Sequence, residues 1–144
     1  LDGMVLEAEL AEQVNGIKNS GDAEAALSRI LSEWERIPEN SRDELRGTAV
    51  LKEAERLGKT EDWLGAIAWI EAAAGQYGGN SLFENVLRTL RQNRAGELHN
   101  GFAALYNKRD YNGAKAFIEK ALEEYPGNRQ LEGDLKLVER ALGR

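Results

Sequence analysis

The chain has 144 residues, of which 42% are hydrophobic and 31% are charged, and its formal net charge is −6. This composition is ordinary for one helix-rich domain with a modest core, and no run of about 18 apolar residues predicts a membrane span. The absence of cysteine excludes disulfides and thiol chemistry and leaves the cellular compartment open.

Charge is distributed unevenly along the chain. Residues 1–63 carry 15 acidic and 8 basic side chains, whereas residues 88–120 carry 7 basic and 3 acidic ones. Nucleic-acid binding needs a broad basic face, so we expect no nucleic-acid partner. No secretory signal is evident, and a first residue of Leu1 rather than Met leads us to expect a piece of a longer chain.

Seven helices and no strand are predicted along the chain. Six of them come from a pattern that occurs three times, in which an aliphatic residue is followed by apolar residues four and seven positions later. Such residues lie on one face of a first helix. The three series are Leu10-Val14-Ile17, Val50-Ala54-Leu57 and Leu98-Phe102-Leu105. The predicted helices span 4–18, 22–37, 41–57, 61–77, 81–106, 110–125 and 129–142.

Each repeat continues into a second helix. An aspartate stands at its start, where a carboxylate can accept from free backbone N–H groups, and Ala and Ile four residues apart form its inner face. These residues are Asp22-Ala26-Ile30, Asp62-Ala66-Ile70 and Asp110-Ala114-Ile118. Pro or Gly then ends the helix. The Asn two residues after it, at Asn40, Asn80 and Asn128, is predicted to cap the next helix.

The repeats span residues 4–40, 41–80 and 81–128, and their spacing is irregular. The first two lie 40 residues apart and the last two 48 residues apart. Leu82, Val86 and Leu90 continue the helical period towards Leu98, so we predict that the extra residues lengthen a single helix over 81–106, about 39 Å long. The alternative is two helices, with a kink or break at Asn93, Ala95 and Gly96. The final helix, 129–142, has the pattern of a capping helix for a repeat array.

This pattern resembles the tetratricopeptide repeat family. The family's Ala, apolar and Ala positions correspond to Ala66-Ile70-Ala73 and Ala114-Ile118-Ala121, with Trp63 and Tyr111 in the aromatic position that opens the second helix. The first repeat departs from the pattern, with Ala23 and Glu33 at two of these positions. The resemblance implies an all-α solenoid of helical hairpins in one domain covering residues 1–144.

The resemblance also implies a function. In tetratricopeptide proteins the first helices line a concave groove that holds a peptide or a partner protein, so we expect a non-enzymatic interaction module without a cofactor. The polar residues that would face this groove are Asn15, Lys18, Asn19, Lys52, Glu55, Lys59, His99, Asn100 and Tyr106. Asn and Lys side chains there suit recognition of a peptide backbone and of carboxylates.

A second interpretation is self-association through the long helix. A basic stripe is formed by three residues that lie three positions apart, Arg88, Arg91 and Arg94. This stripe is either solvated or binds an acidic segment, such as the N-terminal half of another copy. The aromatic residues of the second helices, Trp34, Trp63, Trp69 and Phe117, are interpreted mainly as packing residues.

The sequence predicts neither a catalytic nor a metal site. His99 is the only histidine, and no cysteine or carboxylate cluster at ligand spacing accompanies it. Gly58-Lys59-Thr60 is similar to the end of a phosphate-binding loop, but Glu53 occupies the position where that motif needs glycine. We interpret this segment as a turn between helices.

Overall fold

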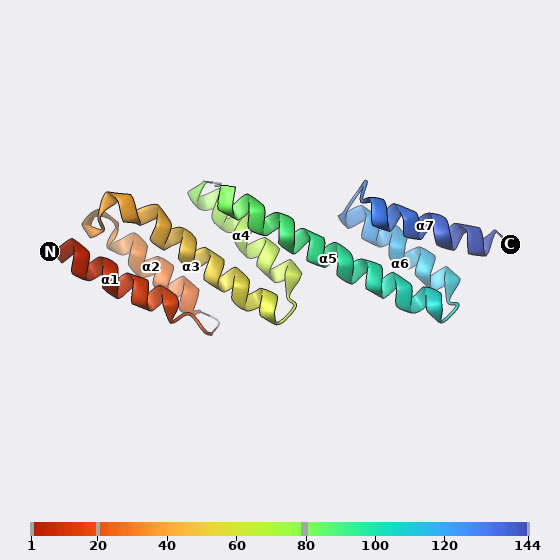
Figure 1. Ribbon diagram of the computed structural model, residues 1–144, viewed down its shortest axis with the longest axis horizontal. Helices are drawn as coiled ribbons and strands as arrows, with labels where there is room; N and C mark the ends of the chain where they lie inside the picture. Colours follow the sequence, from red (N-terminus) through yellow and green to blue (C-terminus); the bar gives the residue numbers. More distant parts are fainter. Residues whose placement is uncertain (1, 20, 79–80, 144) are drawn as a thin grey trace. The chain divides into compact units, whose positions relative to one another are not determined.

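The computed structural model describes residues 2–19, 21–78 and 81–143. Across these ranges the chain forms seven α-helices, one short 3-10 helix and no strand (Figure 1), which confirms the all-α prediction. The elements are α1 (Asp2–Asn15), α2 (Asp22–Ser32), η1 (Trp34–Arg36), α3 (Glu39–Lys59), α4 (Trp63–Tyr77), α5 (Ser81–Asn107), α6 (Tyr111–Glu124) and α7 (Arg129–Leu142). None of the helices described is both long enough and apolar enough to cross a membrane.

The largest differences from the predicted boundaries are at the ends of the first two helices. Helix α1 ends at Asn15 rather than at residue 18, with Gly16 closing its last turn onto Glu12 and Gln13. Helix α2 ends at Ser32 and gives way to η1, so the predicted helix over 22–37 is too long. Ile37 is extended, as a residue before proline prefers to be, and the helix cannot continue through it. The single long helix over 81–106 is confirmed by α5.

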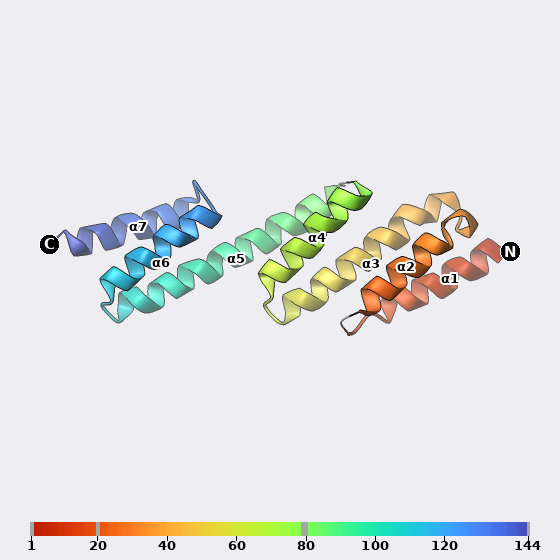
Figure 2. The same cartoon turned by 180° about the vertical axis from the view of Figure 1, so that it is seen from behind.

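The chain divides into two compact units, Leu1–Leu90 and Arg91–Arg144. In the first unit α3 packs against α1, α2 and α4. Figure 1 shows α1, α3 and the start of α5 on the near side of this unit, and Figure 2 shows α2 and α4 on its opposite side. In the second unit α6 packs against α7.

The predicted core residues are buried. The Ala and Ile positions of the second helices are 0% exposed in all three repeats, at Ala26, Ala66, Ala114, Ile30, Ile70 and Ile118. Small alanine side chains at these positions allow the two helices of a hairpin to approach closely. The leading aliphatic residues Leu10, Val50 and Leu98 are also buried. The repeated part of the sequence is therefore mostly core.

Helix α5 contributes to two separate cores. Phe83, Leu87 and Leu90 belong to the core of the first unit, whereas Leu98 and Phe102 belong to the core of the second. Within each group the buried positions are three or four residues apart, as on one helix face. The lengthened helix therefore completes one core with its first half and begins another with its second half.

The predicted aspartate caps are confirmed at two of the three repeats. Asp62 accepts a hydrogen bond from the backbone N–H of Gly65 at 2.9 Å, and Asp110 accepts one from Gly113 at 3.0 Å. Both partners are glycines, and a Cβ atom at either would lie within about 2.3 Å of the capping carboxylate. The glycine thus leaves space for the cap.

Asp22 does not cap α2, so this part of the prediction is wrong. Its carboxylate turns back and accepts from the backbone N–H groups of Lys18 and Asn19 at 2.9 and 2.8 Å. Helix α2 begins at Asp22 itself, with Gly21 in the N-cap position and the N–H of Ala25 donating to the carbonyl oxygen of Gly21 at 2.9 Å. Asp22 therefore closes the preceding loop.

The predicted asparagine caps have different outcomes. Asn128 accepts from the backbone N–H of Leu131 at 3.1 Å and caps α7 as predicted. Asn40 does not cap α3, because the helix begins one residue earlier, after Pro38, without a side-chain cap. Asn80 lies outside the described residues.

The tryptophans act in packing, as interpreted from their spacing. Trp34, Trp63 and Trp69 pack half-buried against the first core, and Phe117 packs against the second. The indole N–H of Trp69 donates to the carbonyl oxygen of Val50 at 2.9 Å, which links α4 to α3. This bond joins the two helices of the second repeat.

Candidate binding groove

One face of α3 is only partly covered by other helices. Residues three or four apart form a row along this face, here called the α3 row: Ser41, Glu44, Thr48, Leu51, Glu55 and Gly58. Glu44 and Glu55 are exposed and the others are half-buried. Because of this spacing the six residues share one side of the helix. Two pockets lie along the row.

The larger pocket is apolar and has a volume of about 470 Å³. It is lined by Leu51, Ala54, Glu55, Gly58, Lys59, Trp63, Val86 and Leu90, which belong to α3, the start of α4 and the first half of α5. This volume lies within the range of about 300–1,000 Å³ that is typical of ligand sites. We call it the apolar pocket.

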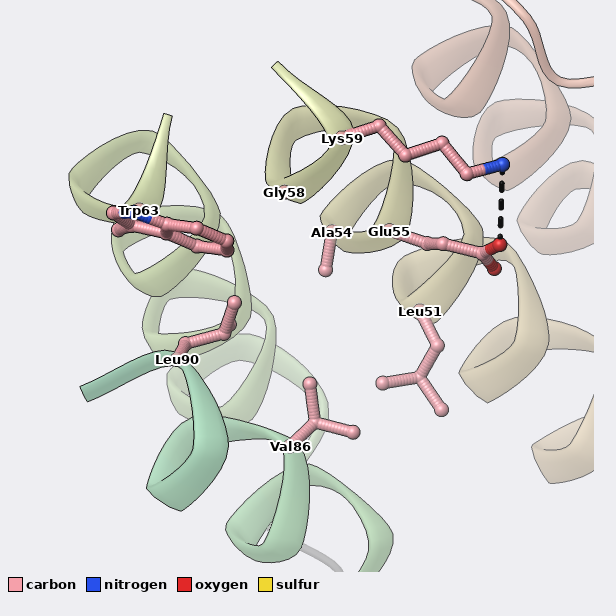
Figure 3. Close-up of a pocket in the computed structure, with 8 residues that line it drawn as sticks. All are labelled: Leu51, Ala54, Glu55, Gly58, Lys59, Trp63, Val86 and Leu90. Carbon is pink, nitrogen blue, oxygen red and sulfur yellow. Dashed lines mark ion pairs between the residues drawn. The ribbon is translucent and has the colours of Figure 1, made fainter. Parts of the chain in front are cut away.

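The walls of the apolar pocket are hydrocarbon. Figure 3 shows Trp63, Val86 and Leu90 on one side, facing Leu51 and Ala54 on the other. A Cβ atom at Gly58 would lie 3.4 Å from the indole of Trp63, so this glycine allows the ring to lie close to α3. The pocket is thus bounded at one end by an aromatic ring.

The charged groups at this pocket stay at its edge. Lys59 forms an ion pair with Glu55 at 3.4 Å, and Figure 3 shows both side chains directed away from Trp63. Their side chains are 75% and 59% exposed. A pair this exposed contributes at most about 1 kcal/mol to stability. It leaves the apolar walls open.

The smaller pocket lies between α1 and α3 and has a volume of about 190 Å³. Its lining residues are Glu7, Ala11, Asn15, Ser41, Glu44, Leu45 and Thr48. The hydroxyl of Ser41 donates to Glu7 at 2.8 Å. Among the described residues, no cation forms an ion pair with Glu7 or with Glu44. We call this the acidic pocket.

The predicted groove residues of the first unit are only partly brought together. Asn15 lines the acidic pocket and Lys59 lines the apolar pocket. Lys52 lies on α3 and lines neither pocket. Lys18 and Asn19 belong to the loop after α1, where their backbone N–H groups bind the carboxylate of Asp22.

In the second unit, two predicted groove residues make contacts within the unit. Nδ1 of His99 lies 2.7 Å from a carboxylate oxygen of Asp134, which is buried. The ring of Tyr106 packs against the rings of Phe102 and Tyr111, with centroids 5.6 and 5.2 Å away. These side chains connect α5 to α7 and to α6.

The basic stripe on α5 is not uniform. Arg88 and Arg91 are exposed, as is Asn100 further along the helix. Arg94 instead donates two hydrogen bonds, of 2.8 and 3.0 Å, to the carboxylate of Glu124 on α6 and also pairs with Glu97. The Glu124 carboxylate raises the pKa of Arg94 above its ordinary value. Arg94 therefore acts within the second unit.

Several pocket residues did not emerge from the sequence. Glu7, Glu44 and Leu51 were not predicted as groove residues, and Trp63 was interpreted only as packing. The spacing of the α3 row was visible in the sequence, but nothing there indicated that another helix would leave it uncovered. Within the described ranges, no group of His, Cys or carboxylate side chains could hold a metal ion.

Comparisons with protein-family models, with curated proteins and with solved structures found no match for this chain.

Proposed function

We propose that this protein is a tetratricopeptide-like interaction module in which the face of α3, together with α1 and the first half of α5, binds a peptide segment of a partner protein. The observation that carries the proposal is the apolar pocket of about 470 Å³, which remains open on the α3 row. When a partner covers apolar surface, the complex is stabilised by about 25 cal/mol for each Å² removed from water. A large apolar side chain of the partner would be the anchor.

The helical hairpins support this proposal. Both pockets lie between consecutive first helices of the repeats, the acidic pocket between α1 and α3 and the apolar pocket between α3 and α5. The resemblance to tetratricopeptide repeats implies a groove lined by first helices. A binding face on helices that are already packed also avoids much of the ordering cost that a flexible loop would incur on binding.

Peptide display provides a direct test. Peptides selected on the wild-type protein should lose binding to Leu51→Glu, because a carboxylate would then enter the apolar pocket. Gln76→Glu is the matched control, since Gln76 is exposed on α4 and lines neither pocket. Circular dichroism must show that both variants remain folded. Peptides that bind the wild type and Leu51→Glu equally well would refute the groove.

The alternative function is self-association through α5. Leu82 is 54% exposed near the start of this helix, and Arg88 is exposed on it. Sedimentation over a wide concentration range distinguishes the two functions. A monomer at every concentration would exclude self-association, whereas a dimer that Leu82→Glu dissociates would favour it.

A further inference from the structure

The two pockets of the first unit share one row of residues but differ in chemistry. Glu44 and Thr48 line the acidic pocket, and Leu51 and Gly58 line the apolar pocket. Thr48 and Leu51 are successive members of the α3 row, and the two pockets flank this row, one towards α1 and the other towards α5. A single ligand lying along this row would meet carboxylates at one end and hydrocarbon at the other.

The acidic pocket lacks a compensating cation. Glu7 comes from α1 and Glu44 from α3, and neither forms an ion pair within the described residues. The one lysine among the residues that line the two pockets is Lys59, which already pairs with Glu55. Residues 1–63 carry a net charge of −7, so the surrounding field also favours a cationic ligand. The complementary group is the side chain of Arg or Lys.

The length of the row sets the spacing within the ligand. Ten residues separate Glu44 of the acidic pocket from Ala54 of the apolar pocket, a distance of about 15 Å along the axis of α3 at 1.5 Å per residue. An extended peptide covers about 3.3 Å per residue, so four or five residues span the same distance. The two side chains that enter the pockets should therefore be four or five positions apart.

The polar groups along the row suit an extended chain rather than a helix. Thr48 lines the acidic pocket and stands between Glu44 and Leu51 in the α3 row, and Asn15 lines the same pocket from α1. Hydroxyl and amide groups can pair with peptide N–H and C=O groups. An extended peptide leaves these backbone groups free, whereas a helix uses them internally.

We propose that the first unit binds an extended peptide segment in which an Arg or Lys side chain enters the acidic pocket and a large apolar side chain, four or five residues away, enters the apolar pocket. This inference depends on the proposed function and names the chemistry of its ligand. The carboxylates supply selectivity and the apolar pocket supplies most of the affinity.

A synthetic peptide tests the pairing of the two side chains. It carries Phe at its centre and Arg five residues away on each side, so that either chain direction presents the pair, and it is labelled with fluorescein for anisotropy. Replacement of both Arg residues by Glu should weaken binding about tenfold or more, and Phe→Ala should do the same. Equal binding of the Arg and Glu peptides would overturn the inference.

A central proline tests the extended conformation. Proline is compatible with an extended backbone but breaks a helix, so a peptide with Pro midway between Phe and each Arg should bind within about twofold of the parent. A loss of about tenfold or more would indicate a helical ligand and would overturn the extended binding mode.

Protein variants locate the cationic contact. Glu44→Lys should lower the affinity for the Arg peptide about tenfold and raise the affinity for the Glu peptide. Glu119→Lys makes the same change in charge on an exposed position of α6, in the second unit, and should leave both affinities unchanged. Equal weakening by the two variants would show a nonspecific charge effect and refute the site.

The two proposals fail in different ways. If display selects peptides that need Leu51 but contain no basic residue, the groove stands and this inference is wrong. If no peptide distinguishes the wild type from Leu51→Glu, the proposed function itself is wrong.

Discussion

The residue before the first aspartate of each second helix has a left-handed backbone. Its φ is 94° at Gly21, 61° at Glu61 and 64° at Arg109. At Glu61 this conformation ends α3, since the N–H groups of Glu61 and Asp62 donate to Gly58 and Leu57 at 3.0 Å each. Glycine adopts such a backbone without strain, but only the first repeat has glycine there. We therefore predict that Glu61→Gly stabilises the first unit.

Two opposing contributions set the expected increase in the free energy of unfolding. A left-handed backbone costs an L-residue about 1–2 kcal/mol, and glycine returns about 0.5–1 kcal/mol of this through the greater entropy of the unfolded chain. The side chain of Glu61 is exposed and forms no ion pair in the described structure, so its removal loses little. The expected net gain is about 0.5–1 kcal/mol.

Urea denaturation followed by tryptophan fluorescence measures this gain, because all three tryptophans lie in the first unit. For a slope of about 2 kcal/mol per molar urea, the midpoint should rise by about 0.4 M. Arg109→Gly should give a similar gain in the second unit, followed by circular dichroism.

The neighbouring position provides the control. Thr60 has an ordinary φ of −95°, so Thr60→Gly gains no relief of strain and should lower the midpoint. If Glu61→Gly lowered the midpoint as Thr60→Gly does, the argument from backbone strain would be refuted.

Two further predictions concern the second core and pH. Phe102 is 1% exposed, so Phe102→Ala should lower the stability of the second unit by about 3–5 kcal/mol. Urea denaturation followed by circular dichroism measures this loss, and a loss below about 1 kcal/mol would contradict the assignment of Phe102 to the second core. Hydrogen bonds from the N–H groups of Lys18 and then Asn19 lower the pKa of Asp22 in the folded protein. The ionised carboxylate therefore stabilises the fold above the unfolded pKa of about 3.9, and this stabilisation is lost as pH falls through the lower pKa of the folded state. The stability difference between the wild type and Asp22→Asn should therefore shrink between pH 7 and pH 3, and a constant difference in fluorescence midpoints would refute the assignment.

Local patterns in the sequence were sufficient for the helices and much of the core. The three- and four-residue spacing of apolar side chains places them on one face wherever a helix forms, so Leu10, Ala26 and Ile30 could be assigned to the core without tertiary information. The caps at Asp62 and Asp110 were predictable for the same reason, since each bond joins residues three apart.

Tertiary contacts determined the remaining features. The pairs Arg94–Glu124 and His99–Asp134 join residues 30 and 35 positions apart, and no short-range pattern indicates them. Asp22 was mispredicted because α2 begins one residue earlier in register than α4 and α6, with Gly21 rather than the aspartate in the N-cap position.

The sequence by itself therefore determined an all-α chain of three helical hairpins with a lengthened fifth helix, because helix periodicity and capping act over a few residues. Only the tertiary structure decided that the α3 row stays uncovered and that Glu7 and Val86, from helices before and after α3, line pockets beside it. A pocket is space left between helices, and its shape depends on how the helices pack against one another rather than on the pattern of any one of them.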